Sequence, residues 1–225
     1  MKKKHIILTL ACIMAITFNA NAQLGGLGKA IKSAAGTAAS NVLKEKVSIE
    51  KFPATLDEFK TLQAELGTTP EGCIMLQLVA MEMYRRDKIV GEQCLALNNT
   101  TTNLADMKRR LSDLFNMNDA YYARPYLVSA MFKGAKPSNG YNPEKPYTIQ
   151  LRKDPTRPND ERSELLKGYV KHYQIYSDGY DTPWRGIDVV QQKGDEYYRV
   201  SNCPAILTQC KEVDFDSTED WKGLE

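Results

Sequence analysis

The sequence predicts an α+β domain in which an N-terminal layer of helices packs on a C-terminal antiparallel sheet. Three observations support this fold class. Apolar residues recur at helical spacing in the first half of the chain, residues 69–87 form a nearly all-apolar helix, and alternation begins near residue 147. Helices and strands that occupy separate stretches of sequence are typical of α+β domains.

The first 22 residues have the pattern of a secretory signal peptide. Lys2, Lys3 and Lys4 precede a short apolar stretch, and Ala20-Asn21-Ala22 has the small residues of a cleavage site. We expect cleavage after Ala22 and export to the periplasm or outside the cell. Cys12 lies in a poor lipobox, so ordinary cleavage is favoured over lipidation.

The mature chain is close to electrically neutral. Loss of residues 1–22 removes three lysines and no acids, which takes the formal charge from +2 to −1. A near-neutral chain has no electrostatic attraction for a phosphate backbone, so we expect no nucleic-acid partner. Its length suits a single domain, which we place at residues 52–213.

Two segments flank this domain. Residues 23–51 are rich in Gly and Ala, and we expect a leader that is weakly helical or disordered. The alternative is an amphipathic helix, because apolar residues between 24 and 42 share one helical face that could contact a membrane or a partner. Residues 214–225 are acidic and are expected to form a loose tail.

The helices can be placed by their start and stop signals. Thr55 to Glu58 forms a capping box before a helix that ends at Gly67. The central helix has Thr69 as its cap and Pro70 at its first position, and so few polar residues that it must be buried. Further helices are expected at residues 88–98, from Asn103 onward, and at 125–132.

Strands are expected in the second half of the chain. Residues 147–151 alternate between apolar and polar, and 168–176, 187–192 and 196–201 are also typical of strands. Lys193-Gly194-Asp195 is a short turn signal, so the last two strands should form an antiparallel hairpin near 187–201.

Three short motifs resemble those of a family of uncharacterised, exported bacterial domains of the Bacteroidetes type. The motifs are the T-P-E-G helix start at Thr69–Gly72, the pattern F-x-G-A-x-P-x-N-G-Y at Phe132–Tyr141, and G-x-D-x-P at Gly179–Pro183. The resemblance covers residues 52–213 and implies a shared fold. The family has no assigned activity, so the resemblance implies no catalytic residues.

Four cysteines remain in the mature chain. Cys203 and Cys210 lie close in sequence near the end of the domain, and in an exported protein they could form a disulfide or remain free. Cys73 and Cys94 fit better as small buried residues. The sequence has no C-x-x-C motif and one mature histidine, so no metal site and no cofactor are expected.

The loop at residues 177–186 has the strongest features of a binding site. Tyr180 and Trp184 lie beside Asp181 and Arg185, and aromatic rings beside polar groups suit sugars or peptides. The competing interpretation is that this loop is a simple turn and that Trp184 fills the core. Tyr141, in the proline-rich connector 134–146, is a fifth candidate. The competing interpretation is that this connector is simply a packed irregular segment.

His172 has no nearby partners for nucleophilic catalysis, so we interpret it as a solvated or hydrogen-bonded histidine. The leading functional hypothesis is therefore a non-catalytic exported domain that binds an envelope protein or a glycan. One alternative is a hydrolase that cleaves glycans with two carboxylates. Another is a structural module whose leader, at 24–42, contacts the membrane.

Overall fold

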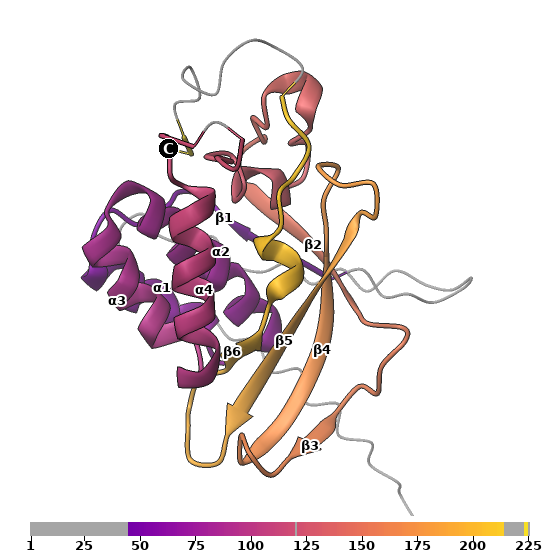
Figure 1. Ribbon diagram of the computed structural model, residues 1–225. Helices are drawn as coiled ribbons and strands as arrows, with labels where there is room; N and C mark the ends of the chain where they lie inside the picture. Colours follow the sequence, from indigo (N-terminus) through magenta and orange to yellow (C-terminus); the bar gives the residue numbers. More distant parts are fainter. Residues whose placement is uncertain (1–44, 120, 214–222, 225) are drawn as a thin grey trace, which may run out of the picture.

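The structure, a computed structural model, describes residues 45–119, 121–213 and 223–224. The helices are Leu56–Leu66 (α1), Pro70–Arg86 (α2), Lys88–Asn98 (α3) and Thr101–Leu114 (α4), with short 3₁₀ turns at Ser129–Met131 (η1), Pro137–Asn139 (η2) and Pro204–Leu207 (η3). The strands are Glu45–Ile49 (β1), Tyr147–Lys153 (β2), Glu161–Ser163 (β3), Gly168–Tyr176 (β4), Trp184–Gln192 (β5) and Arg199–Asn202 (β6). The predicted α+β class is confirmed (Figure 1).

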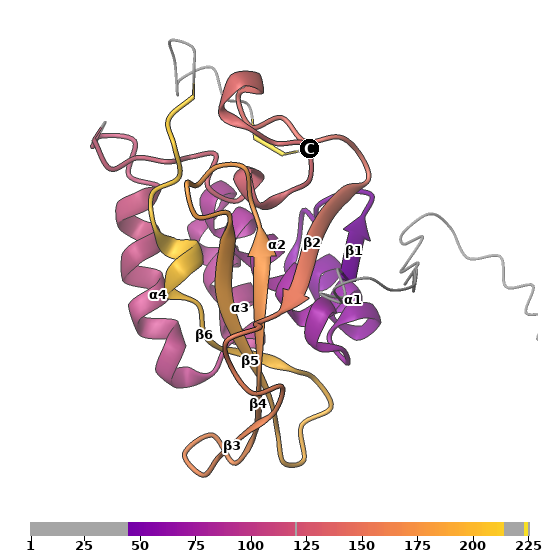
Figure 2. The ribbon, with the colours of Figure 1, turned by 90° about the vertical axis from the view of Figure 1, so that its right-hand side faces the viewer.

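The strands form one antiparallel sheet in the order β1-β2-β4-β5-β6. The short strand β3 pairs with β4 beyond the end of β2, so β2 and β3 lie along the same edge of β4. The four helices cover one face of the sheet, and Figure 2 looks onto the other face, which they leave uncovered. The domain therefore has two layers.

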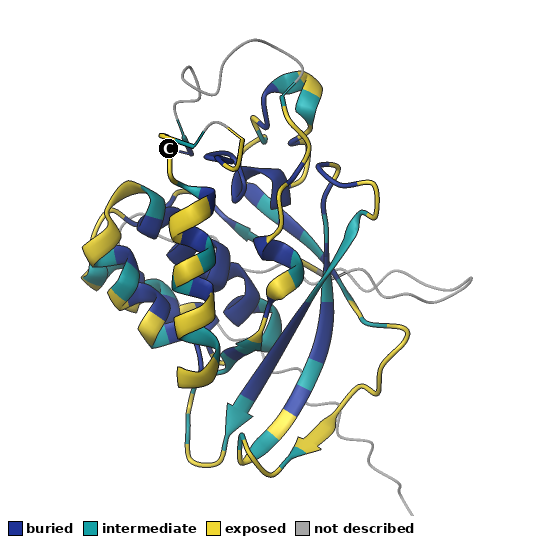
Figure 3. Ribbon diagram, in the orientation of Figure 1, coloured by how far each residue is buried: buried dark blue, intermediate teal, exposed yellow. Residues whose placement is uncertain are grey.

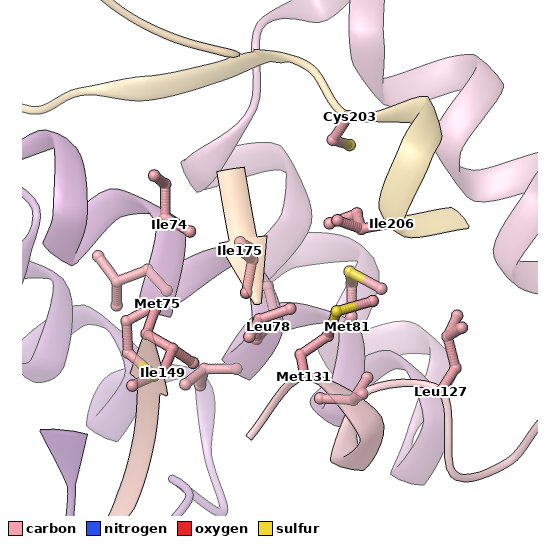
Figure 4. Close-up of a cluster of buried hydrophobic side chains, with 14 of the residues drawn as sticks. Ile74, Met75, Leu78, Met81, Leu127, Met131, Ile149, Ile175, Cys203 and Ile206 are labelled. Carbon is pink, nitrogen blue, oxygen red and sulfur yellow. The ribbon is translucent and has the colours of Figure 1, made fainter. Parts of the chain in front are cut away.

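Helix α2 is the centre of the helical layer, as its sequence predicts. Thr69 caps it by accepting from the N–H of Gly72, and Asp87 ends it and begins α3. Every residue from Gly72 to Tyr84 is buried (Figure 3). Its apolar side chains meet those of the sheet and of the segment around η1 in the core shown in Figure 4, with Leu78, Met81, Met131, Ile149 and Ile175 among them.

Buried amides hold α2 against α3. Gln77 Oε1 accepts hydrogen bonds from Asn98 Nδ2 at 3.1 Å and from Asn99 Nδ2 at 2.8 Å, and Asn98 also donates to the Cys73 carbonyl. All of these side chains are buried, so their mutual hydrogen bonds offset the cost of removing them from water.

The domain begins earlier than residue 52. Strand β1 lies in the segment assigned to the leader and pairs with β2 from Glu45↔Leu151 to Ile49↔Tyr147. Val47 and Ile49 are buried in the core. The alternation Val47-Ser48-Ile49 is too short to distinguish a strand from a linker in sequence, and pairing with β2 decides it. The rest of the leader, the face at 24–42 included, lies outside the described residues.

The end of the chain also differs from expectation. Leu224 is buried in the core, and its carbonyl accepts a hydrogen bond from Arg86 at the end of α2. At least this part of the tail at 214–225 packs on the domain. Other boundaries move by a few residues: α4 begins at Thr101 instead of after Asn103, and the helix expected at 125–132 is reduced to turns and η1.

The hairpin near 187–201 forms, but with a longer connection than a tight turn. β5 runs to Gln192 and β6 begins at Arg199, with Gly194 in the left-handed conformation between them. The far edge of β6 is also bonded. The Thr100 N–H donates to the Val200 carbonyl at 2.9 Å, and the Tyr198 N–H donates to the Gly67 carbonyl at 2.8 Å. The helical layer therefore covers this edge.

Candidate functional site

The structure separates the residues of the predicted binding loop. Trp184 and Arg185 are neighbours on β5, and neighbouring strand residues point to opposite faces of a sheet. The Arg185 guanidinium lies over the Tyr180 ring at 4.3 Å and donates to the Ala205 carbonyl from Nε and Nη2. Tyr180 is buried and donates to the Thr208 carbonyl. These two side chains hold the loop against the η3 segment.

Tyr141 and Asp181 contact the same segment. The Tyr141 ring is fully buried, stacks on Tyr126 with centroids 4.9 Å apart, and donates its O–H to the Lys211 carbonyl. Burial raises the pKa of Tyr141 far above that of a free phenol. Asp181 is exposed and pairs with Lys211 Nζ at 2.8 Å. Four of the five predicted residues thus surround residues 205–211, and the contacts described for them are within the protein.

Trp184 points the other way, onto the face of the sheet that the helices leave uncovered. Its ring meets Tyr176 edge to face at 5.2 Å, and the Arg152 guanidinium lies 4.0 Å from its centroid. Arg152 Nε donates to Gln174 Oε1 at 2.7 Å. Next to Trp184 on this face is Gly186, where a Cβ would have no atom within 4 Å. We call Arg152, Gln174, Tyr176 and Trp184 the Trp184 platform.

Alternation within the strands and the pairing between them bring the Trp184 platform together. Arg152, Gln174 and Tyr176 come from β2 and β4, and the registers Arg152↔Gln174 and Tyr176↔Trp184 place them side by side. The platform is partly exposed, so its rings and polar groups can reach solvent. The Arg152 contacts seen here are with two neutral groups, an amide and an indole ring.

His172 is the buried centre of a polar cluster on the same face. Its Nδ1 lies 2.8 Å from Asp188 Oδ1, and its Nε2 lies 3.1 Å from Glu161 Oε2. Arg157 donates to both oxygens of Asp188, at 3.1 and 3.0 Å, and Asn202 donates to Oδ2. The His172 ring and the Arg157 guanidinium thus both face the carboxylates of Asp188 and Glu161.

The His172 cluster has the contacts of a structural network. Both ring nitrogens face carboxylates, which leaves neither of them to take a proton from a substrate. The imidazole is nearly inaccessible, with 1% of the side chain exposed. The interpretation of His172 as a hydrogen-bonded histidine is confirmed. Within residues 45–119, 121–213 and 223–224, no group of three or more metal-ligating side chains is arranged to hold an ion.

The four cysteines in the described residues are free, so the structure has no disulfide between Cys203 and Cys210. Cys203 contacts Asn103 and Met107 of α4, whereas Cys210 lies in the cluster around Tyr141. Burial raises the pKa of each of these two thiols to about 12. Both fit as small buried residues, as do Cys73 and Cys94.

A family model described as "Domain of unknown function (DUF6935)" matches residues 51–214. The chain belongs to the DUF6935 family. The matched range nearly coincides with the 52–213 covered by the resemblance, and it includes the Trp184 platform and the His172 cluster. No curated protein and no solved structure matches the chain. The DUF6935 domain therefore has to be interpreted from its own geometry.

In the parts of the DUF6935 domain that are described, no helix is long and apolar enough to cross a membrane. Sequence reasoning found Trp184 but missed Arg152, Gln174 and Tyr176. Alternation in the sequence predicts that each of these residues lies on the polar face of its own strand. It does not predict which strands are neighbours or in what register they pair, because both depend on the tertiary fold.

Proposed function

We propose that this DUF6935 protein is an exported, non-catalytic domain that binds a glycan on the Trp184 platform. The observation that carries the proposal is the pairing of a partly exposed indole with a guanidinium whose contacts are neutral. Aromatic rings supply flat apolar surfaces for sugar rings, and amide and guanidinium groups supply hydrogen bonds to hydroxyls.

The charge of Arg152 favours a sugar that carries a carboxylate. A guanidinium binds a carboxylate through two parallel hydrogen bonds, and Arg152 already holds its plane over the indole ring, so it loses little freedom on binding. Gly186 leaves open space beside the ring, where a sugar can approach the backbone. We therefore expect preference for an acidic glycan over a neutral one.

A non-catalytic role is favoured by the contacts that the two carboxylates of the His172 cluster already make. Asp188 and Glu161 already bond His172 and Arg157, so they are engaged in holding the fold. A glycosidase needs two carboxyl groups that both reach the scissile bond. Release of new reducing ends from a glycan would favour the hydrolase over the binding domain.

The binding test uses the mature chain, residues 23–225, in which Trp221 is replaced by Phe so that Trp184 is the remaining tryptophan. Its fluorescence is titrated with a galacturonic acid hexasaccharide and with a neutral N-acetylglucosamine hexasaccharide. We expect saturable binding of the acidic probe. Arg152→Gln should weaken it about tenfold, equivalent to about 1.4 kcal/mol.

Arg162→Gln is the matched control, because Arg162 is an exposed arginine of β3 whose ion pair is with Glu164. It should leave binding unchanged. If neither hexasaccharide binds, the glycan proposal is wrong, and co-purification with envelope proteins becomes the test of a protein partner. Binding of the neutral probe alone would contradict the role given to Arg152.

Export is a separate part of the proposal. It is supported by the basic, apolar and small-residue pattern of residues 1–22. The full chain should be expressed in a Gram-negative host, fractionated, and sequenced from its N-terminus. We expect the mature protein outside the cytoplasm and beginning at Gln23. An uncleaved cytoplasmic chain would overturn the export proposal without affecting the binding test.

A further inference from the structure

The sheet carries a pocket on its other face, away from the Trp184 platform. Asp160, Tyr169, Lys171, Gln191 and Tyr198 line a hollow with a volume of about 350 Å³. Tyr169 and Lys171 lie on the side of β4 that also carries Tyr173 and Ile175, which is the side facing the helices. The lower parts of β4 and β5 extend past the helices, which leaves this part of the face open (Figure 1).

The lining combines two tyrosines with charged and polar side chains. Tyr169 and Gln191 are cross-strand partners, and Tyr169 is 57% exposed. Lys171 forms an ion pair with Asp160, and its hydrogen bond to Asp160 raises the pKa of the Lys171 ammonium despite partial burial. A charged donor and a charged acceptor therefore lie side by side in a pocket that two tyrosines also line.

Gln191 fixes the connection between β5 and β6 beside the pocket. Its Nε2 donates to the carbonyls of Asp195 at 3.2 Å and Glu196 at 3.0 Å. Tyr198, two residues further on, is fixed by its backbone bond to Gly67. The walls thus belong to bonded strands and turns, as a preformed site requires.

Asp160 reaches the pocket from residues 154–160, the segment that joins β2 to β3. This segment is fixed on the other face of the sheet, where Arg157 bonds Asp188 and Glu161 contacts His172. Asp160 precedes Glu161, so the two side chains point to opposite faces. The His172 cluster therefore positions Asp160 beside Lys171.

We propose that this pocket binds a neutral sugar of one or two rings. The Lys171–Asp160 pair has no net charge, so it offers no net attraction to an ion. A vicinal diol suits it better, because one hydroxyl can accept from the ammonium while its neighbour donates to the carboxylate. The tyrosine rings supply stacking surfaces for the sugar, and the volume is in the lower range of small-molecule sites.

The pocket and the Trp184 platform lie on opposite faces, so they can be tested separately. The mature chain is titrated by NMR with glucose, galactose, mannose, N-acetylglucosamine and maltose, each up to about 50 mM, which covers the millimolar affinities expected of small ligands. We expect at least one sugar to bind saturably. Lys171→Met and Asp160→Asn should each weaken that binding about tenfold or more.

Tyr122→Ala is the matched control for Tyr198→Ala, since Tyr122 is a half-exposed tyrosine outside the pocket. Tyr198→Ala should weaken binding, and Tyr122→Ala and Trp184→Phe should not. The positioning role of the cluster is tested with Arg157→Gln, which should weaken binding and shift the amide resonances of residues 160–163 in the free protein. Rescue by Arg157→Lys should be partial, because Arg157 bonds Asp188 from Nη1 and Glu161 from Nη2, whereas lysine has one terminal nitrogen.

The proposal is wrong if none of the five sugars binds, or if binding survives both Lys171→Met and Asp160→Asn in protein that circular dichroism shows to be folded. Binding that is lost with Trp184→Phe but kept in the pocket variants would also overturn it, and would support the platform instead.

Discussion

Gly91 of α3 lies directly against the backbone of Tyr84 in α2. A Cβ on Gly91 would come within 2.0 Å of the Tyr84 Cα and 2.2 Å of its backbone nitrogen. Neither atom belongs to a flexible side chain, so the helices would have to move apart. The close approach of α2 and α3 after the break at Asp87 therefore depends on this glycine.

Gly91→Ala should destabilise the domain strongly. Overpacking usually costs about 1–3 kcal/mol, and contact with backbone atoms places this substitution at or above the upper end. Urea unfolding followed by circular dichroism measures the effect. Gly186→Ala is the control, because the space around Gly186 is empty, and it should change stability by less than about 1 kcal/mol. An equal loss of stability in the two variants would contradict the importance of the close contact between Gly91 and Tyr84.

Glu82→Gln should also destabilise the domain. The Glu82 side chain is fully buried and pairs with Arg85 three residues on and Arg86 four residues on. Removing one partner of a buried ionic group commonly costs about 3–5 kcal/mol, because the remaining charges lose their compensation.

Asp106→Asn is a matched control for Glu82→Gln. Asp106 pairs with Arg109 and Arg110 at the same spacings, but on the exposed face of α4. Exposed ion pairs contribute little to stability, so its unfolding midpoint should stay close to that of the unmodified protein. A comparable loss in both variants would show that burial is not what makes Glu82 important.

The thiols should be unreactive in the folded protein. Burial raises the pKa of Cys94, Cys203 and Cys210 to about 12 and moves that of Cys73 in the same direction. With Ellman's reagent at pH 8, the mature chain should react with none of its four thiols when native and all four in urea. Reaction of only two thiols in urea would indicate a disulfide.

The same groups make stability depend on alkaline pH. A thiol whose pKa is higher in the folded state binds more protons there. Its contribution to the free energy of unfolding is therefore complete below the pKa of the unfolded state, about 8.5, and is lost as the pH rises toward 12. We expect the free energy of unfolding to fall between pH 8.5 and 11. Cys94→Ala should make this decline shallower, and an unchanged slope would exclude Cys94 from the effect.

Arg157→Gln should loosen β3 without unfolding the sheet. Arg157 joins the segment before β3 to Asp188 on β5, and its own side chain is partly exposed. Hydrogen exchange should become faster at residues 161–163, while the α2 amides stay protected. Faster exchange throughout the domain would mean that Arg157 stabilises the whole fold.

The sequence predicts the helical layer well because its signals are local. The Thr69 cap, Pro70 at the first position and the apolar run up to Tyr84 define α2 without reference to the rest of the chain. Strand β1 is different, since Val47-Ser48-Ile49 is convincing only beside β2. Its pairing depends on residues about a hundred positions away, which local patterns cannot report.

The candidate sites depend on the same long-range information. Trp184 and Arg185 are adjacent in sequence and lie on opposite faces, whereas Arg152 and Trp184 come together through the pairing of β2, β4 and β5. His172 and Asp188 are directly opposite across β4 and β5. Strand alternation predicts which residues share a face of one strand, but register decides which partners they meet.

The two borders of the sheet have different consequences for self-association. The outer border of β6 and of Tyr198 before it is already bonded by Thr100 and by the Gly67 carbonyl, so another chain cannot add a strand there. Within the described residues, β1 has only β2 as its sheet neighbour. If β1 pairs with β1 of a second molecule, the product is a two-fold dimer whose two β6 borders are both already bonded. Further strand addition at β6 is therefore blocked by the way the helices meet this border.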